Sequence, residues 1–294
     1  MDCHCSFTPH SPETRKRVSD DLKKRVIRLY ITTKISLSEL GELYGVHPSS
    51  INRWIQETII NPPNQGIAPV SDFSGFICID GKELKVLGEK RSLLWACDSK
   101  TKKLLCYTYE PKENIESSKN LLDLLRDTFP KQIRGISSDF GRGRCFITPI
   151  REYFPETIHQ ICLVHFQRYL NLKLPKSRKS KYFWRNKIFR RVIKAIIKAP
   201  TKEDARLLLQ RLVLLRKGFP ASYHKRFIRS LERNFDILTA YMENPELPNN
   251  SNAIESWNRT LKRKLKNIDG FKSDVLCKCF LKLWFEYKTM MNMK

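Results

Sequence analysis

Short apolar segments divide the chain into a helical start, an alternating middle and a helical end. Between residues 20 and 60, apolar residues recur at helical spacing, which predicts a small all-α unit. A stretch rich in Pro, Gly, Asn and Ser follows over residues 61–74 and is typical of a linker. Beyond it, strand-length apolar runs separated by charged turns indicate a second, larger domain.

The first unit, residues 20–60, has the residue spacing of a helix-turn-helix. Gly41 allows two helices to approach closely, Gly45 suits a left-handed turn, and Pro48 suits the first turn of the following helix. The outer side of that helix keeps polar residues that can contact base edges and phosphates. These candidate DNA-binding residues are Ser49, Ser50, Asn52, Arg53 and Gln56. A plain helical hairpin that makes protein contacts is the alternative.

The pattern of residues 75–174 predicts a mixed α/β sheet. Three apolar runs divided by charged turns predict a meander: GFICIDGKELKVL, SLLWACDS and KLLCYTYE. A helix, the strand QIRGISSD, a short helix and the strand TIHQICLV complete the order β-β-β-α-β-α-β. Short turns and helical crossovers together predict a five-stranded sheet of mixed direction.

The remaining sequence is helical in pattern, and its first part is strongly basic. Residues 173–198 hold eleven Lys and Arg residues and no acidic residue. With aromatic residues interleaved, such a stretch can follow phosphates and stack on an exposed base. The alternative is a solvated helix with core aromatics, and a core position is the favoured interpretation for Phe183, Trp184 and Phe189 individually.

Charge narrows the choice of partner. The chain has 55 Lys and Arg against 30 Asp and Glu, a net charge of +25. Nucleic acid suits this excess because each neutralised phosphate releases a counterion. A membrane partner is not expected, since no apolar run approaches the roughly 20 residues that a span needs. The N-terminus lacks the apolar core of a secretory signal, so we expect a cytoplasmic, nucleoid-associated protein.

Cysteine usage fits the same compartment. The chain has nine cysteines at irregular spacing, which does not suggest a disulfide framework. Buried thiols are expected for the cysteines inside apolar runs, which are Cys78, Cys97, Cys106 and Cys277. Residues 1–19 are expected to form a flexible basic tail. A zinc site built there from Cys3, His4, Cys5 and His10 is disfavoured, because no second ligand pair follows.

Two aspartates directly follow hydrophobic strands. Asp80 ends the run FICID, and Asp139 ends IRGISSD. If these strands are neighbours, the two carboxylates converge on one cation, which would offset their mutual repulsion. Oxygen ligands of this kind suit Mg²⁺ or Mn²⁺, and a pair of such ions serves phosphoryl transfer. A strand-terminal Asp is more often a turn residue, and Asp98 is interpreted in that way because KTKK follows it.

A single carboxylate opens the basic helical segment NNSNAIESWNRTLKRKLKN. Glu255 precedes cationic candidates for phosphate binding, which are Arg259, Lys262, Arg263 and Lys266. Glu255 could close a capping box with Asn252 or pair with Arg259 one turn later. It could also bind a metal ion beside a nucleic-acid backbone. These roles are compatible, because a capped helix fixes the position of the carboxylate.

Taken in order, these segments resemble the ribonuclease H-like core of DDE transposases from bacterial and archaeal insertion sequences. The order of Asp80, Asp139 and Glu255 carries that resemblance. The segment FPETIHQICLVHFQRYL, with its Q-x-C-x-x-H core, resembles a signature of the mutator-like branch. The stretch N-A-I-E-S-x-N-R-x-L-K resembles the Glu helix of that branch. The resemblance covers most of residues 75–286.

The resemblance implies that Asp80, Asp139 and Glu255 are the catalytic triad and hold Mg²⁺ or Mn²⁺. It implies a basic helical insertion over residues 175–245 and a return to the core over residues 246–294. The implied activity is that of a transposase, which cleaves DNA at transposon ends and joins the freed 3′-hydroxyl to target DNA. Double-stranded DNA is then the partner, and pairing of two ends predicts a homodimer or a higher oligomer.

Cys162 and His165 belong to the mutator-like signature, which places both near the active site. A C-x-x-H pair can supply half of a zinc site, but no second pair lies nearby. His165 either positions a phosphate or an ion ligand, or is a core histidine. Cys162 is expected to be structural.

Two other functions stay open at this point. The first is a non-catalytic, sequence-specific DNA-binding protein derived from a transposase, which fits the helix-turn-helix and the compact length. The second is a ribonuclease H-like nuclease that acts on RNA or branched DNA.

Overall fold

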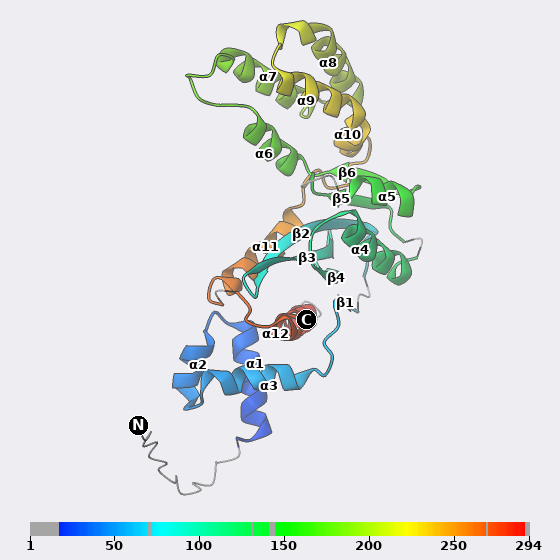
Figure 1. Cartoon of the computed structure of the whole chain (residues 1–294). Coiled ribbons are helices and arrows are strands. Elements are labelled where there is room, and N and C mark those ends of the chain that lie inside the picture. Colours follow the sequence, from blue (N-terminus) through cyan, green and yellow to red (C-terminus); the bar gives the residue numbers. More distant parts are fainter. Residues whose placement is uncertain (1–17, 70–71, 131, 141–144, 269, 292–294) are drawn as a thin grey trace, which may run out of the picture. The chain divides into compact units, whose positions relative to one another are not determined.

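The computed structural model describes residues 18–69, 72–130, 132–140, 145–268 and 270–291 (Figure 1). The chain forms two compact units, residues 1–60 and 61–294. The tail cysteines considered for zinc, Cys3 and Cys5, lie outside the described residues. Among the described residues, no helix is long and apolar enough to cross a membrane.

The described part of the first unit consists of three helices, α1 (Asp20–Thr32), α2 (Leu37–Tyr44) and α3 (Pro48–Thr58). Ser36 and Glu39 form a capping box at the start of α2. Gly45 ends α2 with φ of 62°, the left-handed conformation predicted from the sequence. At Gly41, a Cβ atom would lie 2.6 Å from the Val46 carbonyl oxygen, so glycine permits the close approach of the turn to α2.

A six-stranded sheet forms the centre of the second unit. Its strands are β1 (Gln65–Ile67), β2 (Phe76–Val86), β3 (Glu89–Asp98), β4 (Leu104–Glu110), β5 (Gly135–Ser138) and β6 (Ile158–Ile161), in the spatial order β1-β4-β3-β2-β5-β6. Strands β1 to β4 pair antiparallel, and β2, β5 and β6 pair parallel, as predicted for a mixed sheet. The prediction of five strands is wrong, because three residues of the expected linker pair with β4 as an edge strand.

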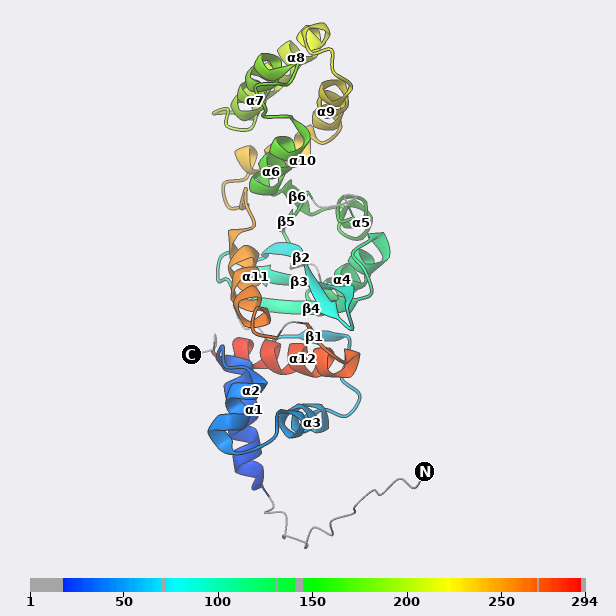
Figure 2. The same cartoon turned by 60° about the vertical axis from the view of Figure 1, so that its left-hand side comes forward.

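Helices cover both faces of this sheet (Figures 1 and 2). On one face lie α4 (Ile115–Thr128) and α5 (Ile147–Tyr153), and on the other lie α11 (Asn252–Leu265) and α12 (Asp274–Met291). Neighbouring residues of β3 point to opposite faces. Leu94 shares a core with Leu121 of α4, whereas the ring of Trp95 lies 5.8 Å from that of Trp284 in α12.

A helical group with its own core lies between β6 and α11 in the sequence. It comprises α6 (Leu163–Lys173), α7 (Phe183–Ile196), α8 (Lys202–Leu214), the 3₁₀ turn η2 (Leu215–Gly218), α9 (Ser222–Arg233) and α10 (Phe235–Glu243). The Gln160 side chain of β6 attaches α10 to the sheet. Its Nε2 donates to the Leu238 carbonyl, and its Oε1 accepts from the Tyr241 N–H.

The aromatic residues of α7 separate into core and surface. Phe189 is fully buried, as expected, but Trp184 is 67% exposed, so the predicted core position of Trp184 is wrong. Five residues separate the two rings, which places them roughly 140° apart around the helix. Lys187 Nζ lies 5.0 Å from the exposed indole ring. The seven cysteines of the described part are buried and form no disulfide with one another, and they include the four predicted to be buried thiols.

Candidate active site

Asp80 lies on β2, and Asp139 directly follows the adjacent parallel strand β5. In the register of β2 and β5, Ile79 pairs with Ser138, so the two aspartates are the next residues after this pair. The expectation that Asp80 ends its strand is wrong, because β2 continues to Val86 beside β3. Strand β5 ends at Ser138, opposite Ile79. From Asp80 onward, no described strand pairs with that side of β2.

The Asp80 carboxylate is buried and held on both oxygens. It is 5% exposed, its Oδ1 accepts from the Gly81 N–H at 2.8 Å, and its Oδ2 accepts from Asn258 Nδ2 at 2.6 Å. Burial, followed by the negative charge of Asp139, raises the pKa of Asp80 to about 8. A divalent cation bound beside this carboxylate would lower its pKa again.

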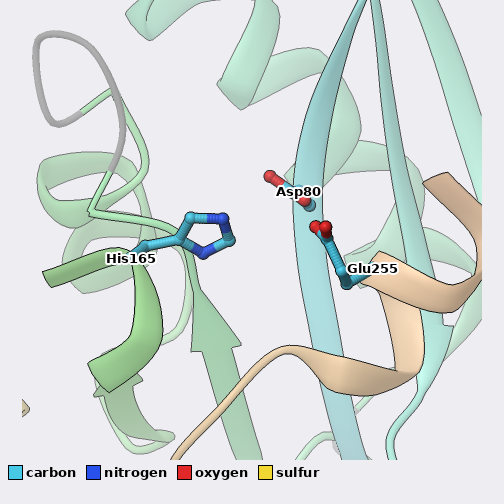
Figure 3. Close-up of side chains that lie close together, drawn as sticks. All are labelled: Asp80, His165 and Glu255. Carbon is cyan, nitrogen blue, oxygen red and sulfur yellow. The ribbon is translucent and has the colours of Figure 1, made fainter. Parts of the chain in front are cut away.

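Glu255 reaches the same place from α11. Ligand atoms of Asp80, Glu255 and His165 all lie within 4.8 Å of one another. Figure 3 shows the three side chains directed into one space from β2, α11 and α6. Two carboxylates and an imidazole converge although the sequence separates them widely.

The local roles considered for Glu255 are wrong. The N-cap of α11 is Ser251, without a side-chain cap, and Asn252 is the first helical residue, so no capping box forms. Within the described residues, Glu255 makes no ion pair with Arg259. The Glu255 carboxylate is therefore free to face Asp80.

Asp139 joins the group through His165. Its Oδ1 lies 3.3 Å from His165 Nδ1, and its side chain is 20% exposed. Burial raises the pKa of Asp139, and the charge of His165 partly offsets this effect. On the other side of the imidazole ring, Arg168 Nη1 lies 3.4 Å from Nε2. His165 thus stands between a carboxylate and a guanidinium.

Cys162 and Ser251 connect the His165 helix to the Glu255 helix. Ser251 donates to Cys162 Sγ from its backbone N–H at 3.3 Å and from its hydroxyl at 3.2 Å. Its Oγ also lies 3.4 Å from His165 Nδ1. Burial favours a lower pKa for His165, but the hydrogen bond with Cys162 and the charge of Asp139 outweigh it and raise the pKa of His165 to about 9. The Ser251 side chain therefore binds α6 instead of capping α11.

Asn258 is a site residue that the sequence analysis did not single out. It is 8% exposed, and its Nδ2 makes the 2.6 Å hydrogen bond to Asp80 described above. Its Oδ1 is buried and has no hydrogen-bond partner in the described part of the chain. Asn258 lies three residues after Glu255, hence on the same face of α11. Helical spacing within the N-A-I-E-S-x-N motif was the signal that could have found it.

The donor set suits a hard divalent cation. Carboxylate oxygens are the usual ligands of Mg²⁺ and Mn²⁺, and both Asp80 and Asp139 have raised pKa values. The predicted triad is brought together only in part: Asp80 and Glu255 belong to the compact group, and Asp139 adjoins it across His165. The catalytic role of the three acids stays a prediction.

The candidate DNA-binding residues lie in both units. Along α11 and at its C-cap, Lys266, the four predicted cations are exposed and, within the described residues, make no ion pair: Arg259, Lys262, Arg263 and Lys266. On α3, Ser49 and Arg53 are exposed, with Arg53 Nε 3.6 Å from Glu57 Oε1. Ser50, Asn52 and Gln56 are half-buried.

Three comparisons relate the chain to known proteins. The family model described as "Transposase, Mutator family" matches residues 2–286. No curated protein matches the chain. Among solved structures, the cryoEM structure of a simian T-cell lymphotropic virus intasome in complex with PP2A regulatory subunit B56 gamma has 10% sequence identity and a TM-score of 0.26. That alignment covers 62% of this chain and 66%, just under two thirds, of that chain.

Proposed function

This chain belongs to the Mutator family of transposases, and we propose that it is a DDE transposase whose triad is Asp80, Asp139 and Glu255. The observation that carries the proposal is the convergence of side chains from β2, α6 and α11. Asp80 and Glu255 have ligand atoms within 4.8 Å of His165 and of each other, and Asp139 lies 3.3 Å from His165. Acids gathered in this way in a protein of net charge +25 indicate a cation site.

The proposal assigns the second unit to a ribonuclease H-like core. An antiparallel meander followed by two parallel strands, with helices on both faces, supports this assignment. Residues 75–174 and 246–294 form the catalytic core, and residues 175–245 form the helical insertion. Residues 20–60 form the DNA-binding domain, with residues 61–74 between the two.

The acids hold Mg²⁺ or Mn²⁺ in this proposal. When bound, such an ion polarises phosphoryl oxygens and lowers the pKa of a bound water. Asp80, Asp139 and Glu255 supply its oxygen ligands. Asn258 fixes one oxygen of Asp80, and His165 orients Asp139 from the side of α6.

Helix α11 aligns the acid with phosphate-binding groups. Its exposed cations follow Glu255 by 4, 7, 8 and 11 residues, a spacing that keeps them on one helical face with the carboxylate: Arg259, Lys262, Arg263 and Lys266. A DNA strand that lies along this face contacts the cations through its phosphates and presents one phosphate at Glu255. Hydrolysis there frees a 3′-hydroxyl, which then attacks target DNA.

The first unit recognises transposon ends in this proposal. Its α3 carries Ser49, Ser50, Asn52, Arg53 and Gln56, and it begins after the left-handed turn at Gly45. Such a helix enters the major groove. Joining two ends requires two catalytic centres, so we propose a homodimer or a higher oligomer on DNA.

A strand-transfer assay with labelled transposon-end DNA tests the proposal. Replacement of Asp80, Asp139 or Glu255 by alanine should abolish Mg²⁺- or Mn²⁺-dependent joining and leave DNA binding in EDTA intact. Joining by the Glu255→Ala protein at the parental rate would refute the triad. Binding without cleavage under any metal condition would favour a non-catalytic DNA-binding protein. Joining of a 3′ end to a second duplex excludes a simple nuclease.

A further inference from the structure

Most of the positive charge of this protein lies on the helical group. Residues 163–243 contain 21 Lys and Arg residues and 5 Asp and Glu residues, which gives +16 of the total +25. The polar side chains of α6 to α10 face solvent, because the apolar residues of these helices form a common core. This segment lies outside the triad, so the catalytic centre does not account for its charge.

A hollow of about 440 Å³ lies in this group, between η2 and α9. It is lined by Arg216, Lys217, Pro220, Lys225, Ile228, Arg229 and Glu232. The α9 residues recur at positions i, i+3, i+4 and i+7, so they form one helical face. The η2 turn brings two further cations to that face. Four cations and one carboxylate thus surround a single hollow.

The four cations of the hollow lack an ion-pair partner in the part of the chain that the structure describes. Arg216, Lys217, Lys225 and Arg229 are all exposed, and none makes an ion pair within the described residues. By contrast, Arg206 and Lys202 of α8 pair with Asp236. Like charges gathered in a concave surface repel one another and raise the local concentration of anions.

The start of α9 adds to the positive potential. Its N-cap is Ala221, which provides no side-chain cap, and its first turn contains no acidic residue. The positive end of the helix dipole is therefore not neutralised by its own side chains. Pro220 and Lys225, on either side of this helix start, both line the hollow.

The residues that line the hollow suit the phosphate groups of a nucleic acid better than its bases. Among the described residues that line it, none has an aromatic ring on which a base could stack, and Glu232 alone offers a side-chain acceptor. Guanidinium groups bind phosphate oxygens in a bidentate manner. The four cations of the lining are exposed, as a site for a long polyanion requires.

We propose that this hollow is a second DNA-contact site, which binds backbone phosphates without reading sequence. Arg216 and Arg229 bind the phosphates, and Lys217 and Lys225 supply further positive charge. The site anchors DNA that extends beyond the catalytic centre. This inference rests on the DNA partner of the proposed function, but it does not depend on catalysis.

Duplex binding by the full chain in EDTA tests the site. Anisotropy of a fluorescent duplex is measured across a salt series for the parent and for the double variant R216Q/R229Q. Each lost phosphate contact lowers the slope of log affinity against log salt by about 0.9, so the double variant should lower it by about 2. The matched control is R151Q/R211Q, which removes one exposed arginine of α5 and one of α8 that make no ion pair within the described residues, and it should leave the slope almost unchanged.

Three outcomes would overturn the site. One is a parental slope for R216Q/R229Q, and another is an equal loss in R151Q/R211Q, which would mean diffuse attraction. The third is saturable binding of inorganic pyrophosphate that R216Q/R229Q abolishes while duplex binding persists, which would identify a small phosphate ligand. Because all measurements are made in EDTA, failure of strand transfer is a separate result. The thermal midpoints of both variants should equal that of the parent, since every replaced side chain is exposed.

Discussion

Replacement of Asn258 by alanine removes the hydrogen bond that α11 donates to Asp80. Both side chains are buried, 8% and 5% exposed, and their 2.6 Å contact joins residues 178 positions apart. A hydrogen bond to a charged group contributes about 1.5–3 kcal/mol. If the bond serves to hold Asp80 ready for a cation, its loss should weaken Mn²⁺ binding about 10- to 100-fold.

Calorimetric titration of the full chain with Mn²⁺ measures this effect directly. A second readout is the rise in thermal midpoint that Mn²⁺ produces, which depends on affinity and should be smaller in Asn258→Ala. The control Asn252→Ala makes the same change at the exposed first residue of α11, nearly two turns earlier. The Asp80→Ala protein gives the baseline for loss of the site. Parental Mn²⁺ affinity in Asn258→Ala, together with lost affinity in Asp80→Ala, would refute the positioning role.

Two further predictions concern the helical group. His224 is fully buried with Nε2 2.8 Å from Asn186 Oδ1, and burial lowers its pKa from 6.5 to about 4. The unfolded chain therefore takes up this proton first, so folding stability should fall by about 1.4 kcal/mol per pH unit from pH 6.5 down to pH 4. Urea titrations should show a shallower fall in His224→Gln, and equal pH slopes would contradict the assignment. Phe189→Ala should cost about 3–5 kcal/mol, whereas Trp184→Ala should change stability by less than about 0.5 kcal/mol and weaken DNA binding. A large loss of stability in Trp184→Ala, measured by the same titrations, would contradict its surface position.

The main strands of the sheet could be predicted from the sequence because each of them produces a recognisable pattern in its own residues. Strands β2 to β4 are long apolar runs bounded by charged turns, and this pattern follows from burial on both faces. The edge strand β1 has only three residues with one buried side chain between two exposed ones. Its stability comes from pairing with β4, about forty residues away, so no local pattern reveals it.

The sequence was enough to single out the acids of the site, but not to predict which residues surround them. The adjacency of Asp80 and Asp139 depends on the order of strands in the sheet, which a sequence pattern does not specify. The exposed position of Trp184 likewise depends on which side of α7 meets the other helices. In both cases the deciding contacts involve distant segments, so residue type and spacing left more than one interpretation open.

The start of α11 shows how a tertiary contact can replace a local one. The sequence around Asn252 and Glu255 suits a capping box, which would direct the carboxylate back to its own helix. In the folded chain, Ser251 occupies the N-cap position, yet both its N–H and its hydroxyl donate to Cys162. The backbone carbonyl of Asn249 also accepts from the Leu163 N–H at 2.9 Å. These contacts tie the start of α11 to the start of α6. Helix α11 therefore begins without a side-chain N-cap, and Glu255 faces His165 and Asp80 instead of its own helix.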